Sequence, residues 1–205
     1  MADPRRVAVL ISGRGSNMQA LVEQAEGYEV VLVASNRTQA HGLDWARSKD
    51  LQSWAWDSRG VTREIFDSEL DRALRRHSVG TIALAGYMRL LSPGFVRDWQ
   101  GRIVNIHPSL LPAHKGLDTH QRALAAGDSE HGCSVHLVTE DLDDGAILAR
   151  AIVPVVAGDD ASSLEQKVLA EEHKLYPAAL SDFVRRRRKS AAGGIQPTIS
   201  SGLKK

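Results

Sequence analysis

The stretch that decides the fold is residues 6–22, which read RVAVLISGRGSNMQALV. It begins with a short apolar run, Val7 to Ile11, of the kind that forms a buried strand. A turn containing Gly13 and Gly15 follows, and apolar residues then recur at helical spacing. A strand, a tight glycine turn and a helix in this order predict the first unit of a parallel α/β fold.

The glycine turn also predicts a binding site. Glycine lets the backbone turn sharply and approach a ligand, and the amides of Gly15, Ser16 and Asn17 lie where the first turn of the helix leaves N–H groups unpaired. A phosphate suits this position because the positive end of the helix dipole lies there as well. A lone Gly-x-Gly also permits a second interpretation, a turn in which Ser16 or Asn17 only caps the helix.

Two nucleotide-binding patterns are missing from this unit. A dinucleotide fingerprint requires a third glycine where the chain has Met18, and an acidic residue after the second strand where it has Asn36. The Gly-x-x-x-x-Gly-Lys-Ser/Thr loop for nucleoside triphosphates is also absent. A single phosphomonoester fits the turn better.

The same alternation of short apolar runs and helical segments continues along the chain. We predict an α/β fold with a mostly parallel central sheet, helices on both faces and a Rossmann-like N-terminal half. The predicted helices are Ser16–Glu26, Gly42–Lys49, Thr62–His77, Thr119–Ala126 and Ser162–Val184. The predicted strands are Arg6–Ile11, Val30–Ala34, Trp54–Trp56, Thr81–Ala85, Arg102–Ile106, Ser134–Val138 and Ile147–Pro154. In the last helix, Ser162 and Glu165 predict a capping box and Pro177 a kink or a break.

Length and composition favour one cytoplasmic, globular domain. The 205 residues suffice for a single core, which we place in residues 1–189, with a disordered tail in residues 190–205. The formal charge of +1 gives no reason to expect nucleic acid, and we find no signal peptide or membrane span. Cys133 is the only cysteine, so an intrachain disulfide is impossible. The basic run 185–189 is interpreted as a solvated helix end.

A polar pair ends the fifth predicted strand. Strand alternation puts Asn105 and His107 on one face, and Pro108 stops regular pairing. Open α/β sheets bind ligands at this edge. An Asn amide donates without changing protonation and a His carries a proton near neutral pH, so together they suit a developing oxyanion. The alternative is two polar residues that bind only backbone.

An acidic loop, residues 139–144, follows the sixth predicted strand. Asp144 and Gly145 are explained by a turn, but the further acids are not. A carboxylate close to His107 would orient the imidazole and favour its protonated form. The spacing does not match a calcium loop. Four histidines, His114, His120, His131 and His136, are separated by six, eleven and five residues, so no metal site is predicted.

The motifs together resemble the folate-dependent phosphoribosylglycinamide formyltransferase family, within the formyltransferase superfamily, over residues 6–185. The resemblance is carried by the Gly-Ser-Asn turn and by four segments: AGYMRLLS (85–92), NIHPSLLP (105–112), GLDTH (116–120) and LDDG (142–145). The two departures are Asp118, where histidine is familiar, and Tyr87, where Phe is common. Asp118 is expected to affect closure of the 112–120 loop.

The resemblance implies the site residues and both substrates. Asn105, His107 and Asp143 would be catalytic. The phosphate of glycinamide ribonucleotide would bind Gly15, Ser16 and Asn17, and Glu172 would bind another part of that substrate. The co-substrate 10-formyltetrahydrofolate would bind a cleft formed by Arg63, Met88, Arg89, Leu90, Leu91, Asn105, Thr139, Glu140 and Asp141.

The implied reaction needs no metal, because the folate carries an activated one-carbon unit. The protein would be a monomer or a homodimer. Three other interpretations remain: a formyltetrahydrofolate hydrolase, which carries a regulatory domain in front; a methionyl-tRNA formyltransferase, for which residues 186–205 are too short to supply an RNA-binding domain; and a noncatalytic phosphate-binding module.

Overall fold

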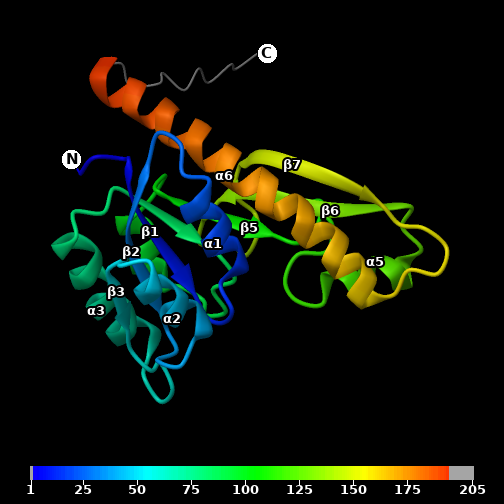
Figure 1. Ribbon diagram of the computed structural model, residues 1–205, viewed down its shortest axis with the longest axis horizontal. Coiled ribbons are helices and arrows are strands. Elements are labelled where there is room, and N and C mark those ends of the chain that lie inside the picture. The colour runs from blue at the N-terminus through cyan, green and yellow to red at the C-terminus, as the bar shows by residue number, and fades with distance from the viewer. Residues whose placement is uncertain (1, 194–205) are drawn as a thin grey trace, which may run out of the picture.

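The fold is an α/β sandwich around one seven-stranded sheet, as seen in the computed structural model, which describes residues 2–193 (Figure 1). The strands are β1 (Arg6–Ile11), β2 (Glu29–Ser35), β3 (Ser53–Ala55), β4 (Thr81–Leu84), β5 (Ile103–His107), β6 (Glu130–Leu137) and β7 (Ile147–Pro154). The helices are α1 (Ser16–Glu23), α2 (His41–Ser48), α3 (Arg63–Arg76), α4 (Pro93–Asp98), α5 (Thr119–Ala126) and α6 (Ala161–Gly193).

The strand order is β3-β2-β1-β4-β5-β6-β7. The first five strands are parallel, whereas β6 pairs antiparallel with β5, and β7 antiparallel with β6. The predicted mostly parallel α/β fold is confirmed. Parallel strands put their carboxyl ends on one edge, so the loops after β1, β4 and β5 meet there.

Two apolar cores cover the two faces of the sheet, which explains why the parallel strands are apolar throughout. One core packs α1, α2 and α6 against residues such as Val9 and Val104. The other packs α3 and α4 against residues such as Leu10 and Ile82. Figure 1 shows α6 running across the sheet beside α1 and ending beyond it.

Several predicted boundaries were wrong. Helix α4 was missed because it has only six residues, although Ser92 caps it and Pro93 occupies its first turn. Strand β6 begins four residues earlier than predicted, at Glu130, because its long pairing with β7 extends it. Helix α1 ends at Glu23, three residues before the predicted Glu26.

Helix α6 differs from its prediction at both ends and in the middle. Asp160 and Ser163 cap its start reciprocally, with distances of 2.7 and 3.0 Å, in place of the predicted Ser162 and Glu165. Pro177 does not divide the helix. The carbonyl of His173, four residues before this proline, accepts a bond of 3.1 Å from the Gln24 side chain, which compensates for the missing N–H.

The end of α6 overturns part of the predicted tail. The helix continues to Gly193, so residues 190–193 are helical where a disordered tail was expected. The rest of that prediction, residues 194–205, lies outside the described residues. Within residues 2–193, no helix combines the length and the apolar character needed to cross a membrane.

Candidate active site

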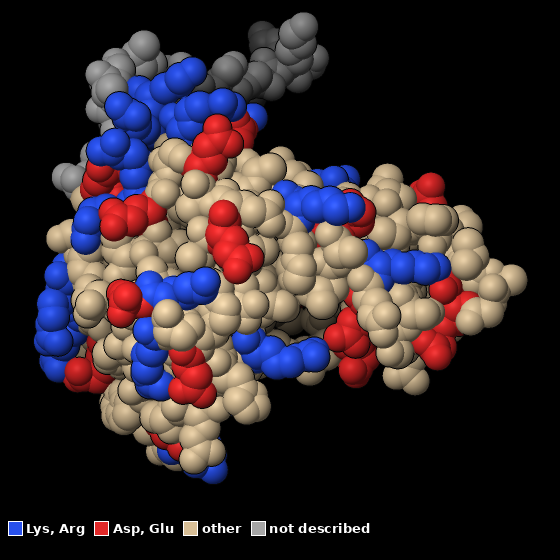
Figure 2. Space-filling model, in the orientation of Figure 1, with Lys and Arg blue, Asp and Glu red and all other residues tan. Residues whose placement is uncertain are grey.

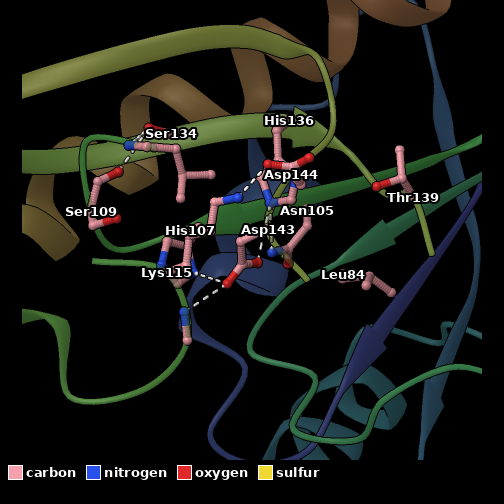
Figure 3. Close-up of polar contacts among 12 residues, drawn as sticks. Leu84, Asn105, His107, Ser109, Lys115, Ser134, His136, Thr139, Asp143 and Asp144 are labelled. Carbon is pink, nitrogen blue, oxygen red and sulfur yellow. Dashed lines mark hydrogen bonds and ion pairs between the residues drawn. The ribbon is translucent and has the colours of Figure 1, made fainter. Parts of the chain in front are cut away.

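The three predicted catalytic residues meet at the carboxyl edge of the sheet (Figure 3). Asn105 and His107 lie on β5, and Asp143 lies on the loop between β6 and β7. The Nδ1 atom of His107 is 3.4 Å from Oδ2 of Asp143. Asp143 adopts a left-handed backbone conformation, with φ of 50°, which Asp tolerates better than most residues. The side chains of His107 and Asp143 are both more than nine-tenths buried.

His136 orients the amide of Asn105. The two residues are direct partners in the antiparallel pairing of β5 with β6, and Nδ2 of Asn105 lies 3.1 Å from Nε2 of His136. Because Nδ1 of His136 bonds the carbonyl of Leu137 at 2.8 Å, that nitrogen carries the proton and Nε2 accepts. One Asn105 hydrogen is therefore used by His136, and the second is free to donate to a substrate oxygen.

Both ring nitrogens of His107 face acceptors. Nε2 donates to the carbonyl of His114 at 3.0 Å, and Nδ1 faces Asp143. Burial lowers the pKa of His107, although the His114 carbonyl and the Asp143 charge oppose this effect. Asp143 thus favours the protonated form of His107, as expected, but burial has the larger effect and the net shift of the pKa is downward.

Asp143 is ionised at neutral pH. Burial alone would raise its pKa, but the polar contacts with His136, the Gly116 amide and His107 lower it overall. The Gly116 amide donates to Oδ2 at 2.9 Å, and Oδ1 lies 3.6 Å from Nε2 of His136. Asp143 therefore ties the 112–120 loop to strands β5 and β6.

The residues predicted to bind glycinamide ribonucleotide lie at the start of α1 and on α6. Gly15 begins α1 in a left-handed conformation, with φ of 77°, so the amides of Ser16 and Asn17 start the helix. The Nδ2 atom of Asn17 donates to Glu172 at 2.7 Å, across 155 positions of sequence. Oδ1 of Asn17 is buried without a partner in the described chain. This polar atom is available to a ligand.

Gly15→Ala should lower the free energy of unfolding by about 2 kcal/mol, because an L residue in this conformation is strained by roughly 1–2 kcal/mol. A Cβ there would also lie 2.9 Å from Cε of Met18 and 3.2 Å from Cα of Gly42. Urea denaturation measures the change. Gly13→Ala is the matched control, since a Cβ at Gly13 meets nothing within 4 Å. Equal losses in both variants would contradict the argument.

Burial raises the pKa of Glu172 to about 7, against the hydrogen bond from Asn17. A carboxyl whose pKa is raised on folding stabilises the fold fully below its unfolded pKa, and this contribution disappears as the pH rises through 7. Glu172→Gln should therefore remove a pH-dependent contribution on the order of 3 kcal/mol between pH 5 and 8. Denaturation at both pH values tests this. Glu171→Gln, on the same helix but partly exposed and paired with Lys174, should keep the wild-type dependence.

The predicted folate segment has two exposed apolar side chains and backbone groups without hydrogen-bond partners in the described chain. Met88 and Leu90 are 60% and 59% exposed. No backbone group of Arg89, Leu90 or Leu91 has a hydrogen-bond partner within residues 2–193, so these groups are free for a ligand. The Arg89 side chain turns inward, where it donates to the carbonyl of Val61 at 2.8 Å. Leu91 packs against the core.

The loop of residues 139–142, between β6 and β7, is the second part of the predicted folate cleft. Thr139 closes it by donating to the carbonyl of Asp141 at 3.1 Å, and Glu140 accepts from Arg97 at 3.1 Å. Leu142 is 55% exposed on this loop. Arg63 is an exposed first residue of α3, and it makes no polar contact with the other folate residues in the described chain. Among the predicted site residues, direct side-chain contacts join His107 to Asp143 and Asn17 to Glu172.

A model for a family described as formyl transferase matches residues 5–180, most of the chain. This chain belongs to the formyl transferase family. The family predicted from the sequence motifs is thus confirmed, and the fold agrees with it. Phosphoribosylglycinamide formyltransferase of Escherichia coli (strain K12) is 42% identical over 192 residues, which cover 89% of each chain. The trifunctional purine biosynthetic protein adenosine-3 of Drosophila melanogaster is 45% identical over 96% of this chain, which spans 15% of that protein's length.

Solved structures of similar proteins have the same architecture. Phosphoribosylglycinamide formyltransferase from Coxiella burnetii superposes with a TM-score of 0.84 and 41% identity, over 90% of this chain and 89% of that one. The enzyme of the same name from Brucella melitensis gives 0.83 and 47%, over 88% and 95%.

Four residues that contribute to the candidate site of this formyl transferase were not predicted from the sequence. His136 was considered as a metal ligand and was not predicted as a site residue, yet it contacts both Asn105 and Asp143. His114 and Gly116 contribute backbone groups, and Lys115 pairs with Asp144. Backbone roles leave no residue-type signal. The signal for His136 was its alternation with Ser134 on one strand, which required the pairing with β5 to interpret.

The other histidines do not form a metal site within residues 2–193. His120 contacts His131 at 3.1 Å, and burial lowers the pKa of His131 to about 4. His114 contacts Asp128 at 2.6 Å. Asp118 adopts a left-handed conformation where α5 begins, without capping it through its side chain.

Proposed function

We propose that this protein transfers the formyl group of 10-formyltetrahydrofolate to the amine of 5-phosphoribosylglycinamide, in de novo purine biosynthesis. The products are formylglycinamide ribonucleotide and tetrahydrofolate. The observation that carries the proposal is the cluster at the sheet edge in which Asp143 contacts His107 and His136, and His136 contacts Asn105. The names of the full-length relatives support the same acceptor.

The first step is attack of the neutral amine on the formyl carbon. A carbon–nitrogen bond forms, and the carbonyl electrons move to the formyl oxygen. Asn105 donates its free amide hydrogen to that oxygen. His107 donates from Nε2 once the oxygen takes the place of the His114 carbonyl. Two donors then stabilise the tetrahedral oxyanion.

The second step moves one proton. The attacking nitrogen releases it, and Nδ1 of His107, which faces the Asp143 carboxylate, accepts it. The proton is held between Nδ1 of His107 and Oδ2 of Asp143, 3.4 Å apart. It then protonates the folate nitrogen as the bond to the formyl carbon breaks. No proton is gained or lost overall.

In this proposal the two substrates bind two separate groups of residues. Gly15, Ser16 and Asn17 hold the phosphate, and Glu172 lies beside Asn17 to bind the rest of the acceptor. Residues 88–91 and 139–141, with Arg63 and Asn105, bind the folate. The folate is a co-substrate that carries the activated one-carbon unit, so its chemistry needs no metal.

Residues 1–189 form one catalytic domain in this proposal, active in the cytoplasm as a monomer or homodimer without nucleic acid. Figure 2 shows basic and acidic side chains interspersed on one face, with basic ones gathered near the end of α6. Several of these charges are engaged within the chain. Arg185 and Arg186 both pair with Asp182, and Arg187 donates to the carbonyl of Gly80 at 2.8 Å. Because these arginines bind groups of the same chain, we interpret the basic end of α6 as a solvated surface.

The test is the absorbance change when the protein is added to 10-formyl-5,8-dideazafolate, with and without glycinamide ribonucleotide. Turnover that requires the amine supports the transferase. Turnover without it identifies a hydrolase. No turnover in either case, with phosphate-ligand binding retained, would leave a noncatalytic binding module.

A further inference from the structure

The segment after β4 is held at both ends by buried side chains that lie outside the proposed folate cleft. At its start, the amide of Met88 donates to Oγ of Ser12 at 2.7 Å. At its end, the amide of Ser92 donates to Oδ2 of Asp67 at 2.6 Å. Ser12 and Asp67 are each only 2% exposed. Between these two bonds lie the three residues whose backbone groups have no partner in the described chain.

The anchor at Ser12 is part of a longer network. Oγ of Ser12 donates to Oδ1 of Asn36 at 2.5 Å, and Nδ2 of Asn36 donates to Oγ of Ser58 at 3.3 Å. The Ser12 amide donates to the carbonyl of Gly86 at 3.2 Å. The hydroxyl therefore has a fixed orientation: it donates its hydrogen to Oδ1 of Asn36 and accepts from the amide of Met88 through a lone pair.

At the other anchor, Oδ2 of Asp67 accepts from the Ser92 amide, while Oδ1 is buried without a hydrogen-bond partner in the described chain. Burial raises the pKa of Asp67, while the bonds from Ser92 and the charge of Arg89 oppose the rise. The Arg89 guanidinium lies 5.0 Å from the ring centre of Phe66, the residue before Asp67. Ser92 in turn caps α4 through its own hydroxyl. A buried acceptor of this kind, without access to water, fixes the position of its donor.

We propose that Ser12 and Asp67 are positioning residues for the formyl donor. They hold the backbone of residues 88–92 so that the free groups of Arg89, Leu90 and Leu91 point into the cleft and meet the folate ring. This inference rests on the proposed function. Neither residue touches the reacting atoms, so both act on the affinity for the donor through geometry.

The experiment measures the dissociation constant of 10-formyl-5,8-dideazafolate by calorimetry, alongside steady-state KM values for both substrates. Asp67→Ala and Ser12→Ala should each weaken donor binding about tenfold, because each leaves a backbone amide without its buried acceptor. The KM for glycinamide ribonucleotide should change less than twofold in the Asp67 variant. Asp67→Asn keeps an acceptor oxygen and should restore most of the affinity.

Tyr87→Phe is the matched control. The Tyr87 hydroxyl lies in the same buried region but has no hydrogen-bond partner in the described chain. Its removal should leave donor affinity unchanged. Thermal unfolding of each variant confirms that it is folded at the assay temperature, and Asp67→Asn serves if Asp67→Ala is not.

Three outcomes overturn the inference. One is wild-type donor affinity in both alanine variants. Another is an equal weakening of the formyl donor and of glycinamide ribonucleotide in Asp67→Ala, which would indicate general damage to the fold. The third is no rescue by Asp67→Asn. A wild-type protein that does not bind the folate analogue would instead remove the proposed function, and this inference with it.

Discussion

Asn105→Ala should lower kcat by about 100- to 1,000-fold, the usual cost of removing one oxyanion donor. In the structure, one amide hydrogen of Asn105 is used by His136 at 3.1 Å, which leaves the other free for the formyl oxygen. The donor is therefore already oriented before substrate binds. Because the bond to the oxyanion forms in the transition state, the main loss should be in kcat, and KM for glycinamide ribonucleotide should change little. Stopped-flow or steady-state absorbance with the dideaza analogue measures kcat.

Asn105→Asp separates hydrogen bonding from packing. This variant keeps the size of the side chain but replaces the donor with a negative charge. If Asn105 acts as a donor, Asp should be at least as damaging as Ala. Near-normal turnover in Asn105→Asp would refute the oxyanion role and leave Asn105 as a packing residue.

Asp143→Asn should lower kcat by about 100- to 10,000-fold, the range that a positioned acid–base partner contributes. Asp143 is the charge that holds the proton on His107 after attack, with its Oδ2 atom 3.4 Å from Nδ1. The amide has no negative charge and turns either oxygen or nitrogen toward His107. It also disturbs the bond from the Gly116 amide, at 2.9 Å, that ties the 112–120 loop to the site.

Asp144→Asn is the control for this variant. Asp144 is the next residue on the same loop, but its side chain is 56% exposed and pairs with Lys115. Its loss should change kcat less than about threefold, since exposed ion pairs contribute little. Equal losses of activity in the two variants would contradict the role assigned to Asp143.

The pH dependence of stability provides an independent check on Asp143. Because its pKa is lowered on folding, the ionised carboxylate stabilises the fold above the unfolded pKa, and this contribution is lost as the pH falls through the lowered value. Asp143→Asn should therefore flatten the acid side of the stability profile and leave its shape between pH 7 and 9 unchanged. Urea denaturation across pH 3 to 9 measures both.

The sequence determined the parts of this protein that depend on local pattern. Residues 6–22 specify a strand, a turn and a helix through hydrophobic period and glycine position, and the structure has them. Strand alternation placed Asn105 and His107 on one face, and the order of short motifs identified the family. These inferences succeed because backbone conformation and side-chain direction repeat over a few residues.

The tertiary structure decided everything that depends on which elements are neighbours. The reversal of β6 relative to β5 places His136 beside Asn105, and the path of α6 brings Glu172 to Asn17. No local period encodes either contact, because the residues are 31 and 155 positions apart. The charge state of His107 was also beyond the sequence. Burial within the complete fold lowers its pKa, and this effect is larger than the opposing effect of the Asp143 carboxylate.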